Sequence, residues 1–157
     1  MHCPSCQAKN ADSAGVCLAC GQPLRPLIRG TVLAKRYEIV EPLGSGGMGV
    51  VYKAHDLQLD EMVALKVLRA DIAAQSARRF TSEIKLARKV RHRNVCAIHE
   101  YHEEGALRFI AMELVEGVDL RRVLKEHGAL PPQEAYDVAL QVALGLEAIH
   151  EVGIVHR

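Results

Sequence analysis

Hydrophobic and polar residues in the first part of the chain alternate in short runs that are typical of β-strands. Tyr37–Val40 and Val50–Ala54 are rich in β-branched and aromatic residues, and they flank a stretch dominated by glycine. The same residue types predict two later strands, Cys96–His99 and Leu107–Met112. We therefore expect a β-sheet in which glycines join the first two strands.

The stretch Val63–Leu68 is predicted to be a strand, in which successive side chains fall on opposite faces. Every second residue from Val63 falls on one face, and Lys66 falls on the other face among apolar neighbours. A lysine in apolar surroundings requires an anion as its partner. The alternative is a surface lysine whose ammonium group reaches solvent.

A helical period runs from Ala73 to Val90, where apolar residues recur at intervals of three and four. Glu83 lies in this apolar stripe and is the only acidic residue between Ala73 and Ile98. A carboxylate that points inward requires a cationic partner. The alternative is an exposed ion pair with Arg79, one turn away on the same helix.

Two helices are predicted in the last third of the chain. Asp119 is suited to cap the N-terminus of a helix over Leu120–His127, and Gly128 is suited to end it. Pro131-Pro132 begins the second helix. Its segment Val138–Ile149 is apolar nearly all round, so we expect it inside a larger core. This segment is too short to cross a membrane.

Composition narrows the class of protein. The chain is 49% apolar and 25% charged, which is an ordinary balance for a globular protein. A formal net charge of +1 gives no reason to expect attraction to nucleic acid or to membranes. The first residues do not form a signal peptide, so we expect a cytoplasmic protein. Its five cysteines then need an explanation that fits a reducing compartment.

Two Cys-x-x-Cys pairs lie close together near the N-terminus, and each pair can place two thiolates on a tight turn. The segment between them is poor in apolar residues, so metal binding is the interaction that could offset the cost of ordering it. The alternatives are two disulfides or free thiols. The segment resembles a short bacterial zinc ribbon, which implies one structural Zn²⁺ held by Cys3, Cys6, Cys17 and Cys20. Basic residues are too few to favour nucleic acid as its partner.

The glycines between the first two strands form the pattern G-x-G-x-x-G at Gly44, Gly46 and Gly49. A dinucleotide-binding loop would lead from a strand into a helix, whereas strands are predicted on both sides here. The chain contains no Walker A motif. We therefore expect a hairpin whose glycines allow the backbone to lie close to phosphates and to adopt positive φ. The alternative is a flexible hairpin turn without a ligand.

The order of motifs resembles that of a protein kinase, and most closely a bacterial Ser/Thr kinase of eukaryotic type. The motifs are the glycine loop, Val63-Ala64-Leu65-Lys66, a helix with Glu83, Met112-Glu113-Leu114-Val115 and a terminal His156-Arg157. The resemblance implies an α+β fold, with an antiparallel sheet and one helix in a small lobe over 37–116. It also implies the incomplete start of the large lobe over 117–157. A linker over 25–36 would separate these lobes from the zinc ribbon at 1–24.

The resemblance also implies roles for individual residues. Lys66, paired with Glu83, would contact the α and β phosphates of ATP, Met112 would gate the back of the pocket, and Asp119 could contact the ribose. Val51 and Ala64 would enclose the adenine, and the backbone of Glu113 and Val115 would pair with it. The phosphate loop would comprise Leu43, Gly44, Ser45, Gly46, Gly47, Met48 and Gly49.

In the kinase template, His156-Arg157 would precede the catalytic Asp, and a later Asn and Asp would bind Mg²⁺ in the complete enzyme. The sequence ends at Arg157. We therefore expect the ATP-binding part of a kinase that does not transfer phosphate by itself. The alternative is a catalytically inactive scaffold that acts through the zinc ribbon or the basic helix. The protein substrate cannot be inferred from the sequence.

Overall fold

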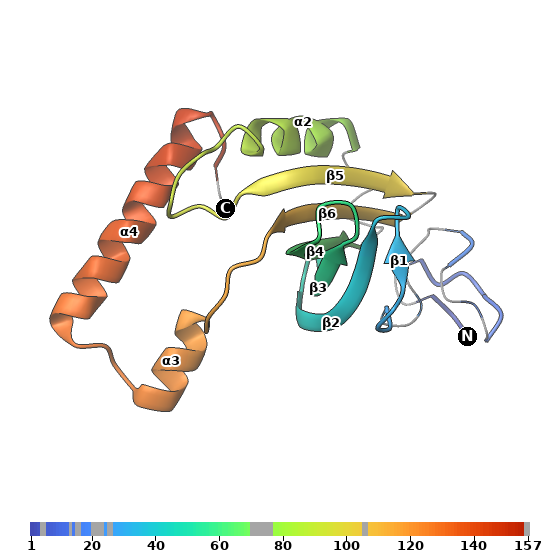
Figure 1. Cartoon of the computed structure of the whole chain (residues 1–157), viewed down its shortest axis with the longest axis horizontal. Coiled ribbons are helices and arrows are strands. Elements are labelled where there is room, and N and C mark those ends of the chain that lie inside the picture. Colours follow the sequence, from blue (N-terminus) through green and yellow to red (C-terminus); the bar gives the residue numbers. More distant parts are fainter. Residues whose placement is uncertain are drawn as a thin grey trace.

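The computed structural model describes residues 1–3, 6–12, 14, 17–19, 24, 27–69, 77–104 and 107–155. Within them, six strands form one antiparallel sheet in the order β1-β2-β3-β4-β6-β5 (Figure 1). The strands are β1 (Val32–Leu33), β2 (Tyr37–Gly46), β3 (Gly49–Asp56), β4 (Glu61–Leu68), β5 (Ile98–Glu104) and β6 (Leu107–Glu113). The helices are α2 (Ala77–Ala87), α3 (Leu120–His127) and α4 (Pro132–Glu151).

The two faces of β4 pack in two different places, as the alternation predicts. Val63, Leu65 and Val67 belong to the main hydrophobic core of the sheet, which also contains Phe109. Leu68, on the opposite face, packs in a smaller cluster with Ile84 of α2 and Ile110 of β6. The sheet therefore has a core face and a second face that is partly covered by α2 (Figure 1).

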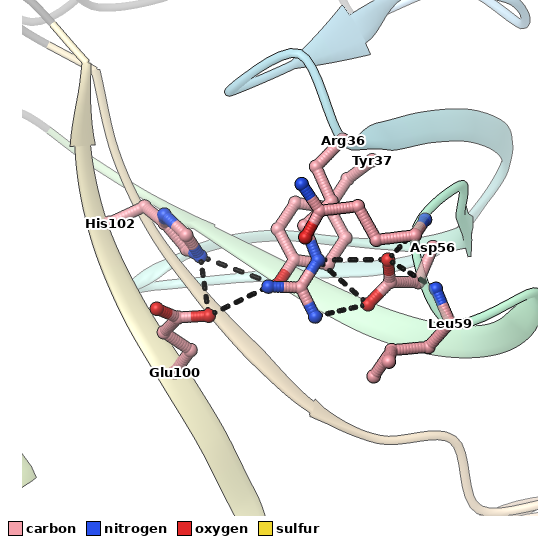
Figure 2. A network of polar contacts seen from close by, with 7 residues as sticks. Arg36, Tyr37, Asp56, Leu59, Glu100 and His102 are labelled. Atoms are coloured by element: carbon pink, nitrogen blue, oxygen red, sulfur yellow. Dashed lines mark hydrogen bonds and ion pairs between the residues drawn. The ribbon is translucent and has the colours of Figure 1, made fainter.

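Polar contacts join the first strands of the sheet to β5, the strand at its other edge, so the two edges of the sheet approach one another (Figure 2). Arg36 binds Glu100 at 3.1 Å, and Nε2 of His102 lies 3.3 Å from the hydroxyl of Tyr37. The backbone N–H of Ala34 donates to Glu104 at 2.8 Å. Burial raises the pKa of Tyr37 to about 12, so its hydroxyl stays protonated at neutral pH.

The two C-terminal helices begin and end where their local signals predict. The side chain of Asp119 accepts a hydrogen bond from the N–H of Arg122 at 2.9 Å, and Gly128 ends α3 with φ of 80°. However, the described residues do not form the larger core that the sequence predicts around α4. Among them, Gly145 is the one buried residue of this helix. Instead, α3 and α4 enclose an open apolar groove of about 630 Å³.

Three details differ from the sequence analysis. The predicted linker includes β1, which is too short to show an alternating pattern and forms by pairing with β2. Cys96, the first residue of a predicted strand, lies outside β5, which begins at Ile98, and it is exposed. The described part of the predicted helix after β4 runs from Ala77 to Ala87. No helix in the described part of the chain combines the length and apolar character that a membrane span requires.

Candidate functional site

The glycine-rich stretch forms the tip of the β2–β3 hairpin, as predicted. Gly46 pairs with Gly49, so Gly47 and Met48 make the turn. Gly49 is buried with φ of +148°, and a Cβ built on it would lie 1.9 Å from the carbonyl oxygen of Val67. The hairpin can therefore lie against β4 because residue 49 has no side chain.

The other glycines of the loop have a different role from the one expected. Gly44, Gly46 and Gly47 do not have positive φ, and a Cβ on any of them would meet no atom within 4 Å. These positions are exposed, so a ligand can approach the backbone of the hairpin tip from solvent. Of the glycines in this loop, Gly49 alone was correctly expected to need a positive φ.

The strand register places several predicted site residues on one face of the sheet. Val51 lies directly opposite Lys66, and Ala64 lies directly opposite Met112. Because opposed residues of antiparallel strands share a face, and because residues two apart on a strand do too, these four side chains are neighbours. This is the face on which Ile110 packs toward α2.

Lys66 and Glu83 do not meet in this structure. Nζ of Lys66 donates to Sδ of Met48 at 3.7 Å, and the ion pairs among the described residues do not include one between Lys66 and Glu83. Glu83 is exposed, whereas its neighbour Ile84 is buried. Successive residues of a helix are about 100° apart around its axis. The side of α2 that packs on the sheet is centred on Ile84, so Glu83 lies at the edge of that side.

The predicted adenine-binding segment comprises the end of β6 and the residues that follow it. The backbone N–H of Glu113 donates to the carbonyl of Ala97 at 2.9 Å, and the thiol of Cys96 lies 3.4 Å from the carbonyl of Glu113. Partial desolvation of the sulfur, together with the nearby carboxylate of Glu113, raises the pKa of the Cys96 thiol, so the thiol stays protonated and can donate. Val115 is exposed, and in the part of the chain that the structure describes its N–H makes no hydrogen bond.

Two contacts of Asn94 hold α4 beside the loop that leads into β5. The side-chain amide of Asn94 donates to the carbonyl of Gln141 at 3.0 Å. A Cβ on Gly145 would lie 2.9 Å from the carbonyl oxygen of Asn94, so the absence of a side chain permits this close approach. The loop that contains Asn94 is thereby held against α4.

The cysteines near the N-terminus cluster as their spacing predicts. The sulfur atoms of Cys3, Cys6 and Cys17 all lie within 4.8 Å of one another, and Cys3 and Cys17 are buried. The sulfurs of Cys6 and Cys17 are 3.6 Å apart, far longer than the about 2.05 Å of a disulfide bond. Cys20, like His156 and Arg157, lies outside the described residues.

The model of the protein kinase domain family matches residues 37–157. The serine/threonine-protein kinase pkn2 of Myxococcus xanthus is 44% identical over 128 residues, which cover 80% of this chain and 15% of that protein. The serine/threonine-protein kinase PrkC of Bacillus subtilis is 37% identical over 133 residues, which cover 83% of this chain and 20% of that protein.

Solved structures agree with these relatives. The PknI kinase domain of Mycobacterium tuberculosis superposes with a TM-score of 0.73 and 32% identity, covering 83% of this chain and 54% of that domain. A structure of Rad53 residues 1–466 in complex with AMP-PNP gives a TM-score of 0.70 and 25% identity. The match covers 78% of this chain and 32% of the Rad53 chain. The chain thus spans only part of each protein it matches. Because the family model covers more than half of its residues, the chain belongs to the protein kinase family.

Proposed function

We propose that residues 37–157 are the ATP-binding portion of a protein serine/threonine kinase, which transfers phosphate from ATP to protein hydroxyl groups. The observation that carries this proposal is the shared face of Val51, Ala64, Lys66 and Met112 beneath the glycine hairpin. An apolar surface and one cation at that place suit an adenine ring and its phosphates. The relatives, which are named as serine/threonine kinases, favour this function over a catalytically inactive scaffold.

In this proposal the adenine ring lies against Val51 and Ala64, and its polar edge meets the backbone that follows Met112. The N–H of Glu113 is already bonded to Ala97, so its carbonyl oxygen is the group that would accept from the adenine amino group. The N–H of Val115 would donate to a ring nitrogen. Asp119 holds the first turn of α3, and this capping role accounts for its side chain without a ribose contact.

The phosphates would lie between the exposed glycines and Lys66. A phosphate oxygen is a much stronger acceptor for the Lys66 ammonium than the thioether of Met48, so nucleotide binding would replace that 3.7 Å contact. Glu83 would then have to turn inward with α2 to pair with Lys66. Such a pairing would fix the lysine against the phosphates.

The described residues do not provide a magnesium site beside these groups. Among the described residues, one cluster contains three or more potential metal-binding side chains, and it is the cysteine group near the N-terminus. Mg²⁺ prefers carboxylate oxygens, and in the family a later Asn and Asp supply its ligands. We therefore expect residues 1–157 alone to bind ATP without transferring its phosphate.

The test is titration of the full chain with a fluorescent, non-hydrolysable ATP analogue. We expect Lys66→Met to weaken binding about 10- to 100-fold, because a hydrogen bond to a charged group contributes about 1.5–3 kcal/mol. Lys125→Met, on the exposed surface of α3, is the matched control and should bind like the unmodified chain. Equal affinity of Lys66→Met and the unmodified chain would contradict the proposal.

We further propose that Cys3, Cys6, Cys17 and Cys20 bind one structural Zn²⁺ in the reducing environment of the cytoplasm. With Zn–S bonds of about 2.3 Å, sulfurs at the corners of a tetrahedron lie about 3.8 Å apart. The 3.6 Å between the sulfurs of Cys6 and Cys17 supports this fit. The zinc would hold the two cysteine pairs together where apolar contacts are few.

Metal analysis of the full chain purified under reducing conditions tests the zinc proposal. We expect about one equivalent of zinc, and its loss in the Cys3→Ser/Cys17→Ser double variant. Cys96→Ser is the control because this cysteine lies beside Glu113, away from the cluster. A zinc content that is unaffected by the double variant would exclude these cysteines as ligands.

A further inference from the structure

The cysteine-rich segment has one buried polar side chain among its described residues, and it belongs to Asn10. Asn10 is 7% exposed. Its amide nitrogen Nδ2 donates to the carbonyl of Ala8 at 2.8 Å and to Sγ of Cys17 at 3.4 Å. Its amide oxygen Oδ1 accepts from the backbone N–H of Leu18 at 3.0 Å. The side chain therefore joins the stretch that follows the first cysteine pair to Cys17 and Leu18 at the start of the second pair.

The neighbours of Asn10 fix the orientation of its amide. The N–H of Leu18 is a donor and requires an oxygen opposite it, whereas the carbonyl of Ala8 is an acceptor and requires an N–H. Reversing the amide would lose both contacts at once. The remaining N–H is then directed at the sulfur of Cys17.

We propose that Asn10 is a positioning residue of the metal centre, where it holds Cys17 beside the first cysteine pair and donates a hydrogen bond to the Cys17 thiolate. This inference rests on the proposed zinc site and goes beyond it, since the spacing of the cysteines does not identify Asn10. Four thiolates around Zn²⁺ carry a net negative charge. An N–H donor at one sulfur disperses that charge and fixes the orientation of the ligand.

The substitution Asn10→Asp separates this role from simple packing. It keeps the size of the side chain and the oxygen that Leu18 requires, but it replaces the N–H groups that face Cys17 and Ala8 with a carboxylate oxygen. Asn10→Ala removes every side-chain contact at this position. Lys9→Gln is the matched control, because the Lys9 side chain is exposed on the neighbouring residue.

The experiment uses the full chain, loaded with Co²⁺ for absorption spectra and with Zn²⁺ for competition against a chelator. We expect both Asn10 variants to bind zinc about 10- to 100-fold more weakly, which is the usual effect of losing a partner of a metal ligand. We also expect the sulfur-to-cobalt charge-transfer band to move to lower energy in both variants, because a sulfur without its N–H donor gives up an electron more readily. Lys9→Gln should match the unmodified chain in both measurements.

Each other outcome overturns a defined part of the inference. Unchanged affinity and spectrum in the Asn10 variants, with normal binding by the unmodified chain, would remove the role of Asn10 and leave the zinc site intact. Weaker binding with an unmoved charge-transfer band would show that Asn10 only packs, and would overturn the hydrogen bond to Cys17. Absence of metal binding by the unmodified chain would overturn both the zinc proposal and this inference.

Discussion

Arg36 and Asp56 are joined by three hydrogen bonds between one guanidinium group and one carboxylate. Nε of Arg36 lies 2.8 and 2.9 Å from the two oxygens, and Nη2 lies 2.6 Å from Oδ2 (Figure 2). The side chain of Asp56 is 2% exposed, and its Oδ1 also accepts from the N–H groups of Gln58 and Leu59. The pair therefore fixes the start of β2 to the end of β3.

We expect Asp56→Asn to reduce the free energy of unfolding by about 2–3 kcal/mol. Asparagine keeps the oxygen that accepts from Gln58 and Leu59, but an NH₂ donor replaces Oδ2, so the charge and the hydrogen bonds from Arg36 to Oδ2 are lost. The loss should fall below the about 3–5 kcal/mol of a fully buried pair, because Arg36 is partly exposed and keeps Glu100. Denaturant titration measures it.

The control is Glu103→Gln, which breaks the more exposed pair with Arg108. This pair should contribute less than about 1 kcal/mol. Equal losses from the two substitutions would show that the Arg36–Asp56 pair behaves like an ordinary surface contact.

The contribution of Asp56 should depend on pH in a defined direction. The hydrogen bonds from Arg36 lower the pKa of Asp56 below its ordinary value of 3.8. Because the folded protein holds this proton more weakly than the unfolded chain, the stabilisation is complete above the ordinary pKa and is lost as pH falls through the lowered one. We expect the difference in free energy of unfolding between the unmodified chain and Asp56→Asn to stay constant from pH 6 to about pH 4 and to decrease from there to pH 2. An advantage that persists unchanged to pH 2 would contradict this account.

Local patterns in the sequence were sufficient to predict much of the fold. The period of two in Val63–Leu68 fixed which side chains enter the core, because a strand offers only two faces. The ends of α3 followed from Asp119 and Gly128, whose roles depend on neighbouring backbone groups. Contacts within a few residues can be inferred in this way.

Contacts between distant residues could not be inferred. Arg36 and Glu100 are 64 residues apart, and nothing in either neighbourhood indicates that the sheet curls to bring them together. The contact of Lys66 with Met48 depends on how the hairpin folds over β4. The sequence predicts that Glu83 points inward because it lies in the apolar stripe of the helix. The helical period alone does not tell whether a residue is at the centre of that stripe or at its edge. The position of α2 decides that difference.

The apolar groove between α3 and α4 should cause association of the chain. Leu124 and Val142 line it and are 43% and 55% exposed. Burying one such side chain contributes about 1.5–3 kcal/mol, so several exposed together favour self-contact. We expect assemblies at tens of micromolar by sedimentation, and a lower average mass for Leu124→Gln/Val142→Gln. Lys125→Gln is the control on the same helix. A monodisperse monomer of the unmodified chain would exclude this behaviour.

Gly49 and Gly47 should respond very differently to the same added methyl group. A Cβ at Gly49 would lie 1.9 Å from the carbonyl oxygen of Val67 and 3.1 Å from Cα of Leu68, both of which are backbone atoms. The residue also has φ of +148°, which L-residues other than glycine rarely adopt. Gly49→Ala must therefore move the hairpin away from β4. We expect it to cost at least about 2 kcal/mol, because overpacking and backbone strain act together.

At Gly47 a Cβ would meet no atom within 4 Å, and the residue does not have positive φ. Gly47→Ala should therefore change the free energy of unfolding by less than about 0.5 kcal/mol. Denaturant titration of both variants measures the contrast, and titration with the ATP analogue shows whether displacing the hairpin also weakens nucleotide binding. Equal stability of the two variants would mean that the hairpin does not lie against β4 as this structure places it. Gly49 would then be needed for its flexibility, and the cradle over Lys66 would have to form only when a nucleotide binds.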